Sequence, residues 1–335
     1  MIISACSLKK DEQKQIVVDE VFQTARDTMD NVDSPTFWKG KNGENWIIST
    51  AKYTDILIVD DAETGKNIKR VGGEGTELGK LDRPNGIFVI DDMAIVVERD
   101  NHRVQLFTLP DFISLGSIGD SLLIKPYGLF VYRISDGYRM YVTDNYETED
   151  EQIPPDNELN RRVHIYTFNV NDSLLSWELQ KTFGDTTGLG RLQVVESIYG
   201  DVENNKILIS EEDVTQSSLK VYDLDGNFTG QVFGKGKFDG QVEGLTLYKC
   251  DSTKGYWIVT NQSYDNNQFL VFDRNTFNLA GTFTGPKTTN TDGIWLTQTP
   301  YGKFTKGAFF AVNNDGNVSA FDWADILKKL KLNCE

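Results

Sequence analysis

One pattern of short apolar segments recurs six times along this 335-residue chain. Each copy has a short apolar segment, a turn, an apolar run that ends in a small or polar residue, and an alternating segment with an aromatic residue near its end. In the fifth copy these segments are Glu243–Tyr248, Trp257–Thr260 and Phe269–Asp273. The copies begin at about residues 35, 84, 126, 196, 243 and 292, a spacing of roughly 42 to 49 residues with one longer interval.

The composition of these segments favours β-strands. They are rich in β-branched and aromatic residues, and Gly, Asp and Asn separate them, as is typical of antiparallel strands. A repeat of about 40 to 50 residues with several strands in each copy is typical of a β-propeller. The six copies therefore predict an all-β fold, a six-bladed β-propeller with four-stranded antiparallel blades. The long interval holds an acidic, Pro-containing insertion at about residues 145–161, which we expect to be a loop.

The two ends of the repeat predict how the ring closes. The sixth copy has three strands and is followed by a short helical tail, Trp323–Leu332. The strand-like segment Gln15–Phe22 has no blade of its own. We expect it to supply the missing outer strand of the last blade, because that pairing removes an open sheet edge. Residues 15–335 then form a single propeller domain.

Charge excludes one class of function and raises a question about another. The chain has 34 Lys and Arg against 50 Asp and Glu, a net charge of −16, which argues against a nucleic-acid partner because phosphate backbones attract the opposite sign. The two histidines, His102 and His164, are too far apart in sequence to suggest a His-rich metal site. The purpose of the many carboxylates remains to be explained.

The N-terminal residues predict an exported protein. Ile3–Cys6 has the aliphatic, small, small, Cys pattern of a bacterial lipobox, and a polar stretch follows it. We therefore expect residues 1–14 to be a lipoprotein-like tether, with a lipid on Cys6, on an outer-membrane or periplasmic protein; an ordinary terminal Cys is the alternative. An exported setting would allow Cys250 and Cys334 to pair, but two free thiols fit the sequence equally well.

Several segments resemble known families. Residues 72–87 together with 101–107 are similar to one NHL-type repeat, which covers a single blade. A broader resemblance is to the β-propeller phytases, calcium-dependent six-bladed phosphatases that act on inositol hexakisphosphate (phytate). The segments that carry it run in order through the repeat: Val32–Trp38, Ile47–Lys52, Val97–Arg99, Glu196–Asp213, Val242–Tyr248 and Thr291–Ile294. Val242–Tyr248 is very close to the family's Ile-Glu-Gly-Leu-Thr-Ile-Tyr, and Thr291–Ile294 matches its Thr-Asp-Gly-Ile.

The sequence departs from the family in its first three copies. Asn31 and Ser34 stand where the family has two carboxylates, and Ala51 replaces the Asp before Lys52. Asn85–Ile90 stands in place of Asn-Asn-Val-Asp-Val-Arg, so its Asp and Arg are absent. Thr143–Asn145 stands where a Gly-Lys-Glu is expected. These departures remove calcium ligands and positive charge together.

Three carboxylates occupy equivalent starts in three successive copies: Glu196, Glu243 and Asp292. The first strand of each blade begins near the channel, so these side chains converge on one face. Three acids at one register are costly unless a cation or water neutralises them, and Ca²⁺ suits such a ring because it takes six to eight oxygen ligands. The alternative is that Glu196 and Glu243 cap backbone amides or bind water.

The resemblance implies roles for a larger set. The expected calcium ligands are Asp33, Glu196, Glu212, Glu243 and Asp292. Lys52 and Arg99 would hold phosphate, Arg99 through its planar fork, and Tyr132 would donate to a phosphate oxygen. Glu212 would hold a calcium or orient the water. The expected catalytic residues are thus Glu196, Glu212, Glu243, Arg99, Lys52 and Tyr132. Alternatively, Arg99 is a solvated surface charge and Tyr132 a packing residue.

These expectations define one principal function and two alternatives. The principal one is a monomeric, calcium-dependent phosphomonoesterase of phytase type that hydrolyses a small phosphate ester such as phytate by metal-activated water. The first alternative is a catalytically weakened phytase-like propeller that binds inositol phosphates or a protein partner, which the missing acidic and basic residues favour. The second is an NHL-type protein-interaction platform without calcium.

Overall fold

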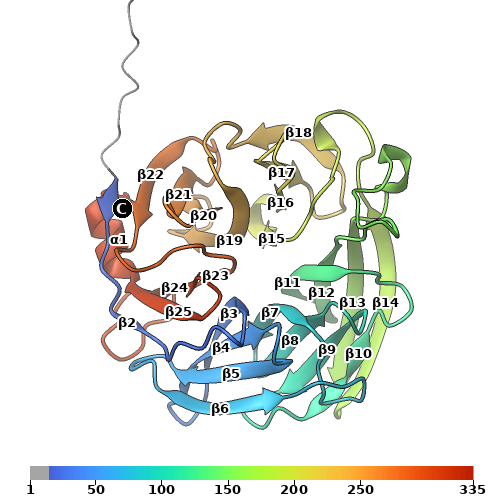
Figure 1. The fold of residues 1–335 in the computed structure, drawn as a ribbon, viewed down its shortest axis with the longest axis horizontal. Coiled ribbons are helices and arrows are strands. Elements are labelled where there is room, and N and C mark those ends of the chain that lie inside the picture. Colours follow the sequence, from blue (N-terminus) through green and yellow to red (C-terminus); the bar gives the residue numbers. More distant parts are fainter. Residues whose placement is uncertain (1–14, 335) are drawn as a thin grey trace, which may run out of the picture.

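The computed structural model describes residues 15–334, and the expected tether with Cys6 lies outside them. Six β-sheets stand in a ring, each with one strand nearest the centre and successive antiparallel strands running outward (Figure 1). The predicted six-bladed propeller is therefore confirmed, and the first strand of every repeat copy is the innermost strand of its blade.

The strands follow the repeat copies closely. Blades one to three contain β3 (Val32–Lys39), β4 (Asn45–Ala51), β5 (Ile56–Asp61) and β6 (Asn67–Gly72); β7 (Pro84–Ile90), β8 (Met93–Glu98), β9 (Arg103–Thr108) and β10 (Ser114–Ile118); β11 (Pro126–Ile134), β12 (Gly137–Asp144), β13 (Val163–Asn171) and β14 (Leu174–Phe183). Blades four to six contain β15 (Ile198–Asp201), β16 (Lys206–Glu211), β17 (Ser218–Tyr222) and β18 (Phe228–Phe233); β19 (Gln241–Lys249), β20 (Gly255–Gln262), β21 (Gln268–Asp273) and β22 (Leu279–Thr284); β23 (Ile294–Thr297), β24 (Ala308–Asn313) and β25 (Asn317–Asp322).

The hydrophobic core lies between neighbouring blades. Leu57 and Val59 of β5, for example, share a cluster with Ile87 of β7 and Val96 of β8. All four side chains are buried, and full burial of an aliphatic side chain contributes about 1.5–3 kcal/mol. Similar clusters at the other blade junctions hold the inner strands at fixed distances from the channel.

The N-terminal segment closes the ring in two pieces rather than one. β2 (Phe22–Gln23) pairs antiparallel with β25 and supplies the fourth strand of blade six, as predicted. β1 (Ile16–Val17) pairs parallel with β22 and adds a fifth strand to blade five. Between them the chain crosses from one blade to the other, with backbone hydrogen bonds from Val18 N to Thr284 O (2.9 Å) and from Val21 N to Ala320 O (2.7 Å).

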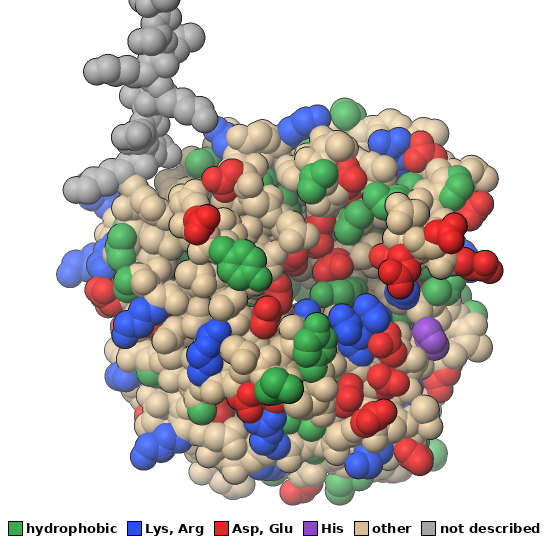
Figure 2. Space-filling view, viewed as in Figure 1, with side chains coloured by type: hydrophobic (Ala, Val, Ile, Leu, Met, Phe, Trp, Pro, Cys, Tyr) green, Lys and Arg blue, Asp and Glu red, His purple; other side chains and the backbone are tan. Residues whose placement is uncertain are grey.

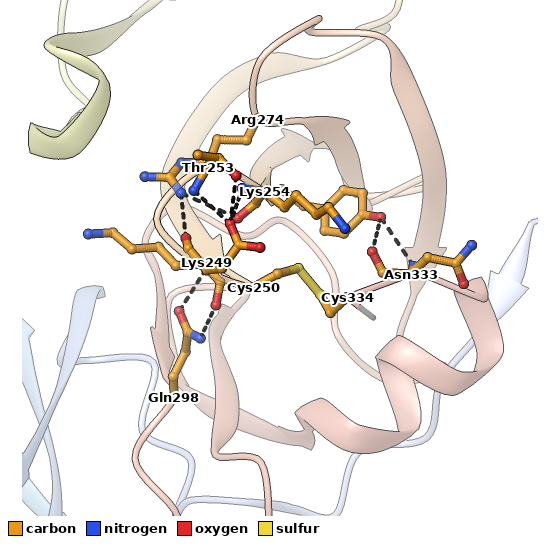
Figure 3. The surroundings of a disulfide bond; sticks show 10 residues. Lys249, Cys250, Thr253, Lys254, Arg274, Gln298, Asn333 and Cys334 are labelled. Carbon is orange, nitrogen blue, oxygen red and sulfur yellow. Dashed lines mark hydrogen bonds between the residues drawn. A yellow bond between two sulfur atoms is a disulfide. The ribbon is translucent and has the colours of Figure 1, made fainter.

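The C-terminal segment is fastened to blade five. The expected helical tail is α1 (Trp323–Leu330), which begins where the Asp322 carboxylate accepts a hydrogen bond from Ala324 N (3.0 Å). Beyond it, Cys334 forms a disulfide with Cys250, and the Tyr256 hydroxyl donates to the Asn333 carbonyl (3.1 Å; Figure 3). The sequence left this pairing open, and the structure resolves it.

The long interval between β12 and β13 is a loop, as predicted, with one short 3₁₀ turn at η1 (Asp156–Glu158). Two further 3₁₀ turns, η2 (Gly188–Gly190) and η3 (Val202–Asn204), flank β15 in blade four. Within residues 15–334, no helix is long and apolar enough to cross a membrane.

Candidate functional site

The inner strands of four of the six blades have the same irregularity at their start. In blades one, two, three and five the pairing with the second strand skips two residues, for example between Val242 and Leu245 of β19. Such bulges re-aim side chains. The first skipped residue, or its equivalent just before β15 and β23, forms a six-membered set that we call the channel ring: Asp33, Asn85, Tyr127, Glu196, Glu243 and Asp292.

Small residues follow the channel ring because the inner strands come close together there. A Cβ on Gly86 would lie 2.6 Å from the carbonyl oxygen of Tyr127, and one on Gly244 would lie 2.7 Å from that of Asp292. Each Gly thus permits the ring residue of the next blade to approach.

Hydroxyl groups on the second strands fix the backbone of the ring residues. Thr50 Oγ1 donates to the carbonyl of Asn85 in the next blade (2.6 Å), and Thr143 Oγ1 donates to the carbonyl of Glu196 (2.8 Å). Ser210 Oγ donates to the carbonyl of Glu243 (3.2 Å). The ring side chains are therefore placed by rigid strands rather than by loops.

Three glutamates meet at one side of the ring. One carboxylate oxygen from each of Glu196, Glu212 and Glu243 lies within 4.8 Å of the others. Glu212 directly follows β16, and its Oε1 is buried without a hydrogen-bond partner among the described residues. In the space-filling view acidic side chains gather around the central hollow of this face (Figure 2).

A lysine partly neutralises the other side of the ring. Lys52 Nζ lies 2.7 Å from Asp33 Oδ1 and 3.8 Å from Asp292 Oδ2. Burial opposes the charged form of Lys52, but the charges of Asp33 and Asp292 prevail and raise its pKa. Tyr127 donates its hydroxyl to Asp33 (3.2 Å), and the Gln262 amide donates to Asp292.

The three clustered glutamates resist ionisation. Burial, followed by the charge of Asp33, raises the pKa of Glu196 to about 7, although Lys52 opposes this shift. Burial, followed by the charge of Glu243, holds the pKa of the Glu212 carboxyl well above its usual range. Burial, followed by the charges of Glu196 and Asp292, does the same to the pKa of Glu243. Converging carboxyls with raised pKa values are typical of a site that a cation completes.

The donor set fits calcium. Glu196, Glu212 and Glu243 converge on one another, while Asp33 and Asp292 lie beside Lys52, the one lysine among residues 15–334 that forms an ion pair with a ring acid. Hard oxygen donors in an irregular arrangement suit Ca²⁺, and the unpaired Glu212 oxygen would gain a partner.

The structure brings together six of the eight residues expected at the site: Asp33, Lys52, Glu196, Glu212, Glu243 and Asp292. Arg99 follows β8 at the position that Lys52 occupies after β4, and so lies on the same end of its blade. Its Nε bonds to Asp100 Oδ1 (2.7 Å) rather than to the ring.

Tyr132 does not join this cluster. It lies five residues beyond Tyr127 on β11, which leads away from the ring, and it lines a separate hollow with Tyr199 and Lys249. Its ring contacts Phe130 (5.9 Å between centroids). Its expected role as a donor to phosphate is therefore not retained, and the packing alternative describes it better.

Four polar residues at the site were absent from the sequence-based set: Asn85, Tyr127, Asn145 and Gln262. Asn145 donates to Glu196 Oε1 (3.3 Å), and Asn85 is buried with neither amide atom hydrogen-bonded among the described residues. Asn85 and Tyr127 are each followed by Gly, as Glu243 and Asp292 are, and this shared pattern would have identified these two residues in the sequence. Asn145 and Gln262 have no such signal.

The Ala51 departure from the phytase pattern does not affect the channel ring. Ala51 packs in the hydrophobic cluster of blades one and six with Val32 and Phe310. A carboxylate at this position would face the blade interior rather than the channel ring. The absent Asp therefore does not subtract a ligand from the ring.

Comparison with known proteins gives a partial family match. A family model described as Phytase matches residues 191–328, less than half of the chain, over blades four to six. No curated protein matches the chain. Hydrazine synthase from Kuenenia stuttgartiensis is similar at a TM-score of 0.52 and 10% identity, over 91% of this chain and 80% of that chain, which shows the fold alone. A structure of BBS1N in complex with ARL6DN aligns at a TM-score of 0.47 and 12% identity, over 91% of this chain and 96% of that chain.

Proposed function

We propose that this phytase-like propeller is a calcium-dependent phosphomonoesterase that releases phosphate from phytate or a related inositol phosphate. The observation that carries the proposal is the cluster of Glu196, Glu212 and Glu243, one carboxylate oxygen of each lying within 4.8 Å of the others. Glu212 also has a buried oxygen that no other described residue hydrogen-bonds. The match to the Phytase model covers the part of the chain that contains these three residues.

The residues of the site divide into cation ligands and phosphate contacts. Glu196, Glu212 and Glu243 would hold the cation, and Asp33 and Asp292 would complete its acidic surroundings. Bound calcium would offset the negative charge of a phosphate and lower the pKa of a nearby water. Without it, an acidic ring repels the substrate, so calcium dependence follows from the charge balance.

Cationic side chains on the rim would bind the phosphate group. Lys52 lies between two ring acids and would share its protons with a phosphate oxygen, while Arg99 would exchange Asp100 for a second oxygen. Tyr127, which already donates to Asp33, lies where its hydroxyl can turn to the substrate. Water attacks phosphorus, the ester P–O bond breaks, and the alcohol leaves with a proton.

An exported location would supply the calcium that this function needs. The disulfide between Cys250 and Cys334 supports an oxidising compartment, because such bonds are rare where cellular thiols are kept reduced. We therefore propose that the protein acts outside the cytoplasm.

A binding function without turnover is the second candidate. The inner strand of blade two contributes Asn85 and Gly86 to the channel, so this strand supplies neither a carboxylate nor a cation there, and Arg99 is the only charged group that the proposal takes from blade two. Such a ring would hold calcium and an inositol phosphate but bring less charge to the reaction.

Phosphate release from phytate, with calcium and with a chelator, tests the proposal. Release that requires calcium supports the enzyme, and calcium-dependent binding of phytate in calorimetry without release supports the second candidate. The absence of both, across several inositol phosphates, would contradict the proposed function.

A further inference from the structure

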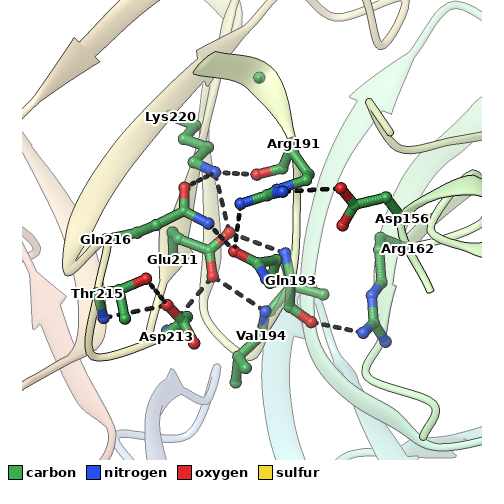
Figure 4. Close-up of polar contacts among 12 residues, drawn as sticks. Asp156, Arg162, Arg191, Gln193, Val194, Glu211, Asp213, Thr215, Gln216 and Lys220 are labelled. Carbon is green, nitrogen blue, oxygen red and sulfur yellow. Dashed lines mark hydrogen bonds and ion pairs between the residues drawn. The ribbon is translucent and has the colours of Figure 1, made fainter. Parts of the chain in front are cut away.

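A buried ion pair in blade four involves the residue that precedes Glu212 of the glutamate cluster. Glu211 and Glu212 are neighbours in sequence, but Glu212 belongs to the cluster while Glu211 pairs with Lys220 of β17 (Figure 4). The distance between Lys220 Nζ and Glu211 Oε2 is 2.9 Å, and their side chains are 1% and 0% exposed. The residue next to Glu212 of the cluster is therefore part of an ion pair that solvent does not reach.

Glu211 ties together the two segments that carry cluster residues. Its carboxylate accepts hydrogen bonds from the backbone N–H groups of Gln193 (2.9 Å) and Val194 (3.0 Å), which lie just before Glu196. In return, the N–H of Glu212 donates to the carbonyl of Val194 (3.1 Å). The position of Glu196 relative to Glu212 thus depends on where the Glu211 carboxylate sits.

Lys220 fixes that carboxylate and braces both segments. Its ammonium also donates to Gln216 Oε1 (2.7 Å), in the loop after Glu212, and to the carbonyl of Arg191, at the start of the segment that leads to Glu196. Three directed bonds from one buried ammonium hold the two segments in a single arrangement.

The last residue of the second strand also binds backbone N–H groups in blade three. There the Asp144 carboxylate accepts from the N–H groups of Ile124 (3.0 Å) and Lys125 (2.7 Å), in the segment that leads to Tyr127. Blade four adds to this arrangement the buried ammonium of Lys220, beside the glutamates proposed to hold the cation.

We infer that Glu211 and Lys220 are positioning residues that set the spacing of Glu196 and Glu212, and through it the affinity of the cluster for calcium. This inference rests on the proposed calcium site. Neither residue touches the cation or the substrate; each acts by holding the backbone of a ligand. Loss of comparable outer-shell partners lowers metal affinity about 10- to 100-fold.

Calcium titration calorimetry on Lys220→Met tests the inference. We expect calcium affinity to fall about 10- to 100-fold, and Lys220→Arg, which keeps a cation there, to recover part of it. The matched control is Arg274→Met, because Arg274 pairs with Asp201 with both side chains fully buried at the other end of β15. We expect this control to lose stability but to keep the calcium affinity of the wild type.

The outcomes separate the inference from the proposed function. Wild-type affinity in Lys220→Met, or an equal loss in Lys220→Met and Arg274→Met, would overturn the positioning role while leaving the calcium site intact. No calcium binding by the wild type would overturn the proposed function itself. If Lys220→Met does not fold, Glu211→Gln, which keeps one acceptor oxygen, takes its place with the same expected loss.

Discussion

Lys52 Nζ and Asp33 Oδ1 lie 2.7 Å apart, so the ammonium of Lys52 pairs with the first acid of the channel ring. Lys52 Nζ also lies 3.8 Å from Asp292 Oδ2, so one ammonium forms ion pairs with acids of the first and the last blade. It therefore helps to close the propeller and to lower the charge of the acidic ring, besides its proposed contact with phosphate.

Replacement of Lys52 by Met should destabilise the protein in a calcium-dependent way. Removing one partner of a buried pair costs about 3 kcal/mol, because the acids it faced remain buried without a counter-charge. We expect this loss at about pH 8 without calcium, and a partial recovery when calcium is added. Thermal unfolding measures both.

The control for this variant is Lys41→Met, which breaks an exposed ion pair with Asp92. Its melting temperature should match that of the wild type, because exposed pairs contribute little. Equal stability of Lys52→Met and wild type without calcium would contradict the account of the ring.

Stability and calcium binding should depend on pH in opposite directions. Glu196 has a pKa of about 7 in the folded protein against a usual value of 4.5, so the folded state holds a proton that the unfolded chain releases. Stability without calcium therefore falls as the pH rises through about 4.5 to 7. Calcium must displace this proton, so its affinity rises over the same range.

Thermal unfolding at about pH 5.5 and at about pH 8, with and without calcium, checks both directions. We expect calcium to stabilise the protein more at the higher pH, and Glu196→Gln to weaken this difference. A calcium-induced shift that is the same at both pH values would show that these carboxyls do not bind the cation.

Arg99→Ala should weaken substrate binding more than it weakens the fold. The guanidinium pairs with exposed Asp100, so its loss exposes no buried charge. Loss of one charge-assisted contact with phosphate should raise KM about tenfold while the melting temperature stays constant. Arg133→Ala is the control, since Arg133 lines the separate hollow with Tyr132. An unchanged KM would remove Arg99 from the site.

Cys334→Ser should destabilise the propeller without affecting the ring. The bond to Cys250 joins residues 84 positions apart and fastens the C-terminal segment to blade five. Its loss should cost about 2–4 kcal/mol in denaturant unfolding. Calcium affinity should remain that of the wild type, because the disulfide and the cluster involve different contacts. A large loss of calcium affinity would show coupling that the structure does not explain.

Much of the fold could be predicted because the spacing of the repeat and the composition of its strands are visible in the sequence. The prediction that the N-terminal segment closes the ring was correct, but the blades with which it pairs were only partly predicted. Gln15–Phe22 reads as one strand, whereas tertiary pairing divides it into β1 on blade five and β2 on blade six. Which neighbouring edge each residue meets depends on the geometry of the closed ring, which a single sequence does not contain.

The sequence predicted the site residues correctly where an acid stands at the start of a repeat copy. It missed them where another residue type stands at the same position. Glu196, Glu243 and Asp292 stand at equivalent starts, and the structure brings them to one ring. Tyr127 occupies the same position, but its residue type concealed it. Tyr132 was chosen for its chemistry, and the direction of β11 carries it away.

The central claim is that the glutamate cluster binds the calcium on which phosphate release depends. The most direct measurement is the rate of phosphate release from phytate at increasing free calcium, for wild type and for Glu243→Gln. We predict that the wild-type rate rises to saturation and disappears with chelator, and that Glu243→Gln stays near zero while remaining folded. Release that persists in excess chelator, or a Glu243→Gln rate equal to that of the wild type, would contradict the claim.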